Sequence, residues 1–150
     1  MLFYFQIVLK LNRMIYNIIS MANYVLFVSS LVMTFIHGIT LFHYPSVSPF
    51  YGFMVIRGCL SSIYNHGSNN LFAKWYDRTV MRESFFADLF YMIHSNTLGS
   101  AGMCMCFAAL LYLISKILQS NFHINPFTNL LHIMAHFGIT IAHVIVITTY

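Results

Sequence analysis

Eight histidines stand out in a chain that has only seven Lys and Arg residues and three Asp and Glu residues. Three of them, His132, His136 and His143, follow at i, i+4 and i+11, so a helix carries them on one face. Imidazoles inside membrane helices ligate haem iron, bind metal ions or relay protons. Because no carboxylate or thiolate accompanies this set, we interpret it as interhelical hydrogen-bonding groups. A haem would need an axial ligand from another helix; the candidates are His37, His43, His66 and His94.

A second pattern is Ser62-x-x-x-His66. Together with Asp77 or Asp88 and the late pair of histidines, it resembles membrane hydrolases of the alkaline ceramidase and progestin-receptor type. Those proteins use Ser, His and Asp with a late histidine pair around zinc, so the resemblance implies a metal-dependent hydrolase. The resemblance covers only these few residues, and the seven spans usual for that class are absent.

Six of the charged residues lie in one 15-residue stretch: Lys74, Asp77, Arg78, Arg82, Glu83 and Asp88. On a helix, Trp75, Arg78 and Arg82 are spaced i, i+3 and i+7 and share a face. Tryptophan prefers the headgroup level of a membrane, and arginine holds a phosphate with two donors at once. The pattern predicts a surface for lipid headgroups or a neighbouring subunit, or else a helix end with mutual ion pairs.

The composition indicates an integral membrane protein. Hydrophobic residues make up 59% and charged residues 7% of the chain, whereas soluble domains carry about 25% charged residues. The net charge of +4 is spread over several loops without a basic run, so we expect no nucleic-acid partner. The three cysteines lie in apolar segments without a CxxC pair, which favours packed thiols. With three acidic residues, carboxylate-driven catalysis by this chain alone is not expected.

The elements that position these residues are predicted to form an all-α membrane bundle in a single domain, 1–150. Arg57 falls inside the second span, where a charge costs about 3 kcal/mol on insertion scales, so it must snorkel or face protein. A helix is expected to resume near Leu71 and to run into the charged stretch. The predicted elements are a short interfacial helix over 1–20 and four spans at about 23–43, 50–64, 98–118 and 129–149.

The basic residues give a weak orientation signal. Lys10 and Arg13 precede the first span, and Lys74, Arg78 and Arg82 follow the second. Both groups therefore fall on one side of the membrane, which the positive-inside rule places in the cytoplasm or in the mitochondrial matrix.

The block Trp75–Ser84 resembles a signature of subunit III of cytochrome c oxidase. That family has an aromatic pair, an Arg-Asp pair, two apolar residues, Arg-Glu and a small residue at the end of its second helix. Weaker matches follow in the right order over roughly residues 30 to 145: Met33–His43, His94, Gly102–Met103, Asn125–Phe127 and Gly138–His143.

The chain also departs from that family. Its charged pair is reversed and followed by the extra Thr79, and about ten extra residues separate His43 from Trp75. The family's Glu in helix three would fall near Leu110 and is missing. The family has seven spans, so a second chain would supply the remaining helices or they would be lost.

The resemblance implies a non-catalytic core subunit of mitochondrial cytochrome c oxidase, respiratory complex IV. Such a subunit is part of an oxidoreductase but binds no haem or copper itself. It packs on the catalytic subunit and holds phospholipid, such as cardiolipin, in a cleft. Trp75, Arg82, Glu83 and His94 would line that cleft, and Arg78 shares their helix face.

We favour this interpretation and expect a multi-pass protein of the inner mitochondrial membrane, whose composition suits an organelle-encoded gene. One alternative is the haem-binding membrane anchor of succinate dehydrogenase, which the surplus of histidines suggests. Another is the Ser/His/Asp hydrolase, in which changing Ser62 or His132 would abolish hydrolysis. A third is an accessory subunit of another respiratory complex.

Overall fold

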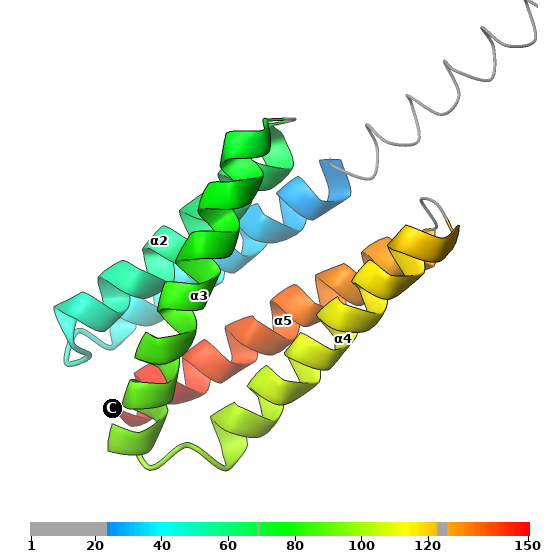
Figure 1. Ribbon diagram of the computed structural model, residues 1–150. Coiled ribbons are helices and arrows are strands. Elements are labelled where there is room, and N and C mark those ends of the chain that lie inside the picture. Colours follow the sequence, from blue (N-terminus) through cyan, green and yellow to red (C-terminus); the bar gives the residue numbers. More distant parts are fainter. Residues whose placement is uncertain (1–23, 69, 123–125) are drawn as a thin grey trace, which may run out of the picture.

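The computed structural model describes residues 24–68, 70–122 and 126–150 (Figure 1). All regular structure in these residues is helical, so the all-α prediction is confirmed. The interfacial helix expected over residues 1–20 lies outside the described residues. The helices are Tyr24–His43, Pro49–Gly67 (α2), Leu71–His94 (α3), Ser100–Phe122 (α4) and Pro126–Thr149 (α5).

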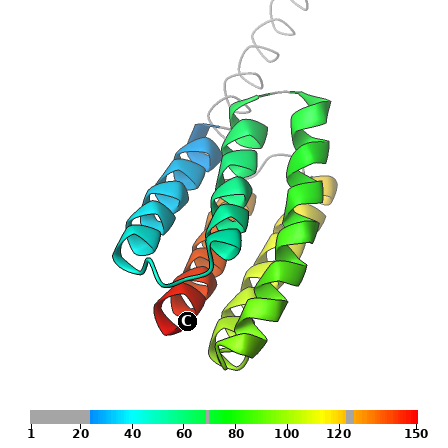
Figure 2. The same cartoon turned by 90° about the vertical axis from the view of Figure 1, so that its left-hand side faces the viewer.

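The helices run alternately up and down in a bundle, with α4 packed along α5 and α2 packed along α3 (Figures 1 and 2). The start of the Tyr24–His43 helix, the α2–α3 turn and the end of α4 lie at one end of the bundle (Figure 1). The C-terminus and the α3–α4 turn lie at the other end. Residues near the α2–α3 turn therefore face the beginning of α5.

Each turn has a local cause in the sequence. Pro49 occupies the first position of α2, where its missing N–H costs nothing. Asn70 caps α3, because its side-chain oxygen accepts a hydrogen bond from the Phe72 N–H at 2.9 Å. After α3 the chain reverses at Asn96, whose φ of 55° suits asparagine better than most residues.

Three helices are long and apolar enough to cross a membrane, and they correspond to three of the four predicted spans. The remaining predicted span, 50–64, lies within α2, which is a helix but is not among the three. The qualifying stretches are Tyr24–His43, Ser100–Ser120 and Phe127–Thr149.

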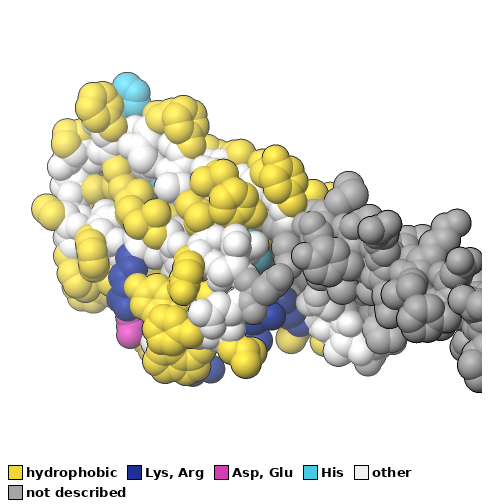
Figure 3. Space-filling view, turned by 90° about the horizontal axis from the view of Figure 1, so that it is seen from above, with side chains coloured by type: hydrophobic (Ala, Val, Ile, Leu, Met, Phe, Trp, Pro, Cys, Tyr) yellow, Lys and Arg dark blue, Asp and Glu magenta, His cyan; other side chains and the backbone are white. Residues whose placement is uncertain are grey.

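Apolar side chains cover much of the surface, and polar side chains lie in the interior. Large apolar side chains such as Phe42, Phe86 and Met103 are exposed, and Figure 3 shows hydrophobic side chains spread over the visible face. The interior holds Ser, His and Asp side chains beside a small apolar core. Since a polar group in hydrocarbon must find its partner inside the protein, these side chains bond across helices.

Arg57 forms an ion pair with a residue of α3 on the outer surface of the bundle. Its guanidinium donates a hydrogen bond of 2.6 Å to the Glu83 carboxylate of α3 and lies 5.9 Å from the centre of the Tyr76 ring. The two charged side chains are 28% and 47% exposed, so the pair sits on the outer surface of the bundle. The pair neutralises both charges there.

Gly138 allows α5 to approach α4 closely. A Cβ at this position would lie 3.0 Å from the Cβ of Ala108 and 3.5 Å from the carbonyl oxygen of Cys104. Gly138→Val is therefore expected to lower the free energy of unfolding by about 1–3 kcal/mol, because the two helices must separate. Unfolding of the detergent-purified protein measures this effect. Gly38→Val is the control, since nothing lies within 4 Å of a Cβ at Gly38.

Candidate functional site

Three imidazoles meet inside the bundle at the end that holds the α2–α3 turn. His66 comes from the last turn of α2, and His132 and His136 come from successive turns of α5. One ring nitrogen from each lies within 4.8 Å of the others. His132 and His136 are buried and His66 is half-buried. We call this set the histidine triad.

A hydrogen bond fixes the tautomer of His136. The Ser29 hydroxyl donates its only proton to the Leu26 carbonyl oxygen at 2.7 Å, so its oxygen must accept from His136 Nδ1 at 3.0 Å. The proton of a neutral His136 is thus on Nδ1, and Nε2 keeps a free lone pair. Metal-binding histidines are commonly oriented in this way by a partner on the other ring nitrogen.

The donor set of the histidine triad fits zinc. Three neutral imidazoles are a known ligand set of catalytic zinc sites, which keep a fourth position open for water or substrate. In the described part of the chain, no Cys, Asp or Glu joins the three nitrogens within the same distance. In the described residues, the triad therefore offers three ligands and no fourth one from the protein.

Asp77 and Ser62 lie at the same end of the bundle as the triad. Asp77 is only 5% exposed and accepts hydrogen bonds from Ser61 at 2.8 Å and from Asn65 at 2.7 Å. The Ser62 hydroxyl is 3.0 Å from the Ser30 hydroxyl. The hydrogen bonds from Ser61 and Asn65 hold the Asp77 carboxylate in place and leave each of its oxygens a further lone pair.

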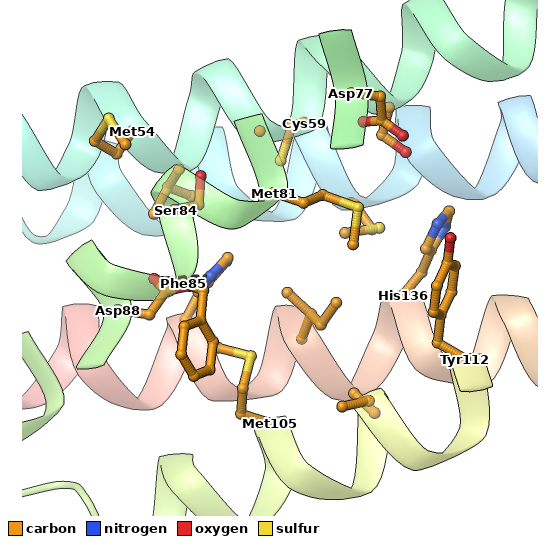
Figure 4. A pocket seen from close by; sticks show the side chains of 18 of the residues that line it. Met54, Cys59, Asp77, Met81, Ser84, Phe85, Asp88, Met105, Tyr112 and His136 are labelled. Atoms are coloured by element: carbon orange, nitrogen blue, oxygen red, sulfur yellow. Dashed lines mark ion pairs between the residues drawn. The ribbon is translucent and has the colours of Figure 1, made fainter. Parts of the chain in front are cut away.

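A cavity of about 300 Å³ extends from this end along the middle of the bundle. Asp77, His136 and Tyr112 lie at one end of it, and Ser84 and Asp88 lie at the other (Figure 4). Between the two ends the walls are largely apolar and rich in methionine, a flexible side chain that adapts to ligand shape. The methionines are Met33, Met54, Met81 and Met105.

A second polar cluster crosses the bundle at the far end of the cavity. His37 Nδ1 is 2.7 Å from the Met33 carbonyl oxygen, and His37 Nε2 is 3.0 Å from His143 Nδ1. His143 Nε2 is 3.2 Å from the Asp88 carboxylate, which also accepts a hydrogen bond from Tyr51 at 3.1 Å.

The predicted interhelical hydrogen bonds are present for two of the three α5 histidines. His136 bonds to Ser29 and His143 bonds to His37, both on the Tyr24–His43 helix. The sequence named His37 and His66 only among four candidate partners for the α5 histidines, and the Ser62-x-x-x-His66 pattern was a second signal for His66. It did not indicate which of the four meets which histidine, or that Asp88 would lie beside His143.

The structure places the expected lipid-binding residues at different levels along α3. Trp75, Arg78 and Arg82 are exposed on α3, as their spacing predicts, and Glu83 is engaged by Arg57. His94 is exposed at the opposite end of α3, where its ring lies 4.0 Å from that of Phe90. Nineteen residues separate Trp75 from His94, a rise of about 28 Å along a helix.

Ser29→Ala is expected to weaken zinc binding by about 10–100-fold, because removing the partner of a ligating histidine releases its orientation. Competition with a chromogenic chelator measures the affinity. Ser30→Ala is the matched control, since the Ser30 hydroxyl bonds to Ser62 and not to a histidine. Equal zinc affinity in the two variants would show that Ser29 does not orient His136.

Comparisons of the chain with family models, curated proteins and solved structures give no match, so a function has to be argued from the geometry of the site.

Proposed function

We propose that this chain is a zinc-dependent membrane hydrolase that cleaves an amide or ester bond of a lipid. The observation that carries the proposal is the meeting of His66, His132 and His136 within 4.8 Å inside an apolar bundle. The Ser62-x-x-x-His66 pattern, the buried Asp77 and the late histidine pair are also the features through which the sequence resembles lipid-cleaving membrane proteins.

Zinc held by three imidazoles supplies Lewis acidity and makes water more acidic. The chain's own residues supply the proton transfers and the binding. Asp77 takes a proton from the attacking water as the water oxygen bonds to the carbonyl carbon. It returns that proton to the leaving nitrogen or oxygen as the bond to carbon breaks. Ser61 and Asn65 orient Asp77 for both transfers.

The cavity provides room for the apolar part of a substrate beside the reacting group. Its walls are mostly apolar, and it starts next to His136 and Asp77 (Figure 4). An alkyl chain that enters the cavity from the triad end places its polar head at the histidines. This geometry favours substrates with one chain and a carbonyl at the end of it.

The test uses the full chain in phosphatidylcholine nanodiscs. The expected result is stoichiometric zinc by elemental analysis and hydrolysis of fluorogenic long-chain amides or esters that a strong chelator abolishes. Asp77→Asn is expected to keep its zinc and to lose about 10²–10⁴-fold in rate, as for a removed general base. Protein that purifies without zinc and cannot be loaded with it would rule the proposal out.

A second candidate rests on the exposed face of α3. Trp75 is 62% exposed, and Arg78 and Arg82 are exposed one and two turns further along the same face. We infer that this face docks phospholipid headgroups or a neighbouring subunit, as in the cytochrome c oxidase subunit III interpretation. In that case the chain works in the inner mitochondrial membrane with the catalytic subunit as partner, and phospholipid is its only bound cofactor.

Arg82→Ala is expected to reduce retained phospholipid or assembly with partner chains, while haem spectra stay unchanged. Lipid analysis and mass spectrometry of the co-purifying chains measure both effects. Unchanged lipid content and unchanged partners in this variant would count against the docking face. This experiment is separate from the zinc test, so each candidate function can fail alone.

A further inference from the structure

Two buried polar atoms without a hydrogen-bond partner mark the end of the cavity that lies away from the histidine triad. In the described residues, the buried side-chain atoms in this state are Ser84 Oγ and His143 Nε2. His143 is only 7% exposed, and its Nε2, although 3.2 Å from Asp88, is not aligned with it for a hydrogen bond. Both residues line the cavity.

The space beside Ser84 is left open by a glycine. Gly58 of α2 faces Ser84, and a Cβ at Gly58 would lie 3.7 Å from the Ser84 hydroxyl oxygen. Both residues line the cavity, and no hydrogen-bond partner from the protein reaches the hydroxyl. An unpaired buried hydroxyl costs about 1–3 kcal/mol, so a ligand group that reaches it gains that energy.

The cavity thus has a polar group at each end and apolar walls between them. Asp77 and Asp88 mark the two ends on α3, and their spacing of eleven positions corresponds to about 16 Å of helix. Figure 4 shows Asp77 beside His136 at one end, and Ser84 and Asp88 at the other. A short polar ligand cannot contact both ends, whereas an extended alkyl chain can.

We propose that the cavity binds a single alkyl chain that carries a hydroxyl group at the end remote from the histidine triad, where Ser84, Asp88 and His143 hold it. The inference rests on the proposed hydrolase function, since it places the bond to be cleaved at the triad and names a hydroxyl-terminated acyl chain as the substrate class.

The chemistry of the remote end selects a hydroxyl over a carboxylate. A hydroxyl donates one hydrogen bond and accepts others, so it can donate to Asp88 and accept from Ser84. A terminal carboxylate would meet the Asp88 carboxylate in a region with few dipoles to offset the repulsion. A plain alkyl end would leave Ser84 Oγ and His143 Nε2 unpaired.

The test uses a photoreactive N-methyl amide of ω-hydroxydodecanoic acid, with a diazirine beside the hydroxyl-bearing carbon, and the full chain in phosphatidylcholine nanodiscs. The expected labels are on the peptides that carry Met54 and Ser84, not on the one that carries Tyr112. The unlabelled hydroxy amide should compete at about tenfold lower concentration than the same amide without the hydroxyl or with a terminal carboxylate.

Ser84→Ala should remove that tenfold preference and leave the affinity for the plain amide unchanged, whereas Ser120→Ala, an exposed serine, should change neither. The labelling is repeated in His132→Ala protein, which the proposed function makes inactive. If the His132→Ala protein still binds the hydroxy amide but no longer hydrolyses substrate, both the hydrolase proposal and the chain-binding proposal are supported. If the hydroxy amide binds but no protein sample contains zinc, only the chain-binding proposal is supported. Equal competition by all three amides, or labels only on lipid-facing residues such as Phe107, would overturn it.

Discussion

His132→Ala is expected to lose zinc and hydrolytic activity together. His132 is buried between the other two histidines of the triad, with ring centres 4.9 Å from His136 and 5.3 Å from His66. Removing an orienting partner already costs about 10–100-fold in metal affinity, so removing a ligand should cost at least about a hundredfold. Elemental analysis after dialysis and a rate measurement on the same sample test both parts.

The control for His132→Ala is His94→Ala. His94 is exposed at the far end of α3 and belongs to no cluster that could hold a metal in the described residues. Its replacement should leave zinc content and rate unchanged. If His132→Ala protein kept its zinc and its rate, the triad would be a packing feature and the hydrolase proposal would fail.

Asp88→Ala is expected to lower the free energy of unfolding by about 3–5 kcal/mol, as when one partner of a buried ion pair is removed. Asp88 is 5% exposed, and its loss leaves the Tyr51 hydroxyl without its acceptor. It also removes the carboxylate that lies 3.2 Å from His143 Nε2. Unfolding of the detergent-purified protein by a denaturing detergent measures the loss.

Glu83→Ala is the matched control for Asp88→Ala, because both are acidic residues of α3. Glu83 is paired with Arg57 on the outer surface, and exposed ion pairs contribute less than about 1 kcal/mol. Asp88→Asn keeps the shape and should cost less than Asp88→Ala. Equal stabilities of the Asp88→Ala and Glu83→Ala proteins would contradict the stabilising role assigned to the buried Asp88.

Hydropathy and proline positions were sufficient to predict most of the fold. The break after Gly67 and the restart at Leu71 follow from a polar stretch that no helix in lipid can bury. The ends of the predicted spans differ from the ends of the observed helices by only a few residues. The predicted span 50–64 is helical as part of α2, but α2 is not among the helices apolar enough to cross a membrane. Its serines, its glycines and Arg57 lower its mean hydropathy.

The site was predictable only in part. The i, i+4 spacing placed His132 and His136 on one face, since residues four apart lie on adjacent turns. It could not say which helix that face meets, because periodicity describes one helix at a time. His66 joins the pair through the packing of α2 beside α5, and the partner of Asp88 is likewise decided by packing.

The last described helix completes both polar clusters, and this sets an order for biogenesis. The hydrogen-bond partner of His37 is His143, 106 residues later in the chain, and that of Ser29 is His136, 107 residues later. During synthesis the earlier helices are made before α5, so Asp88 at first lacks its counter-group. Translation arrested before α5 should therefore leave a nascent chain that stays bound to the insertase and is degraded. Synthesis of α5 should allow the chain to leave the insertase.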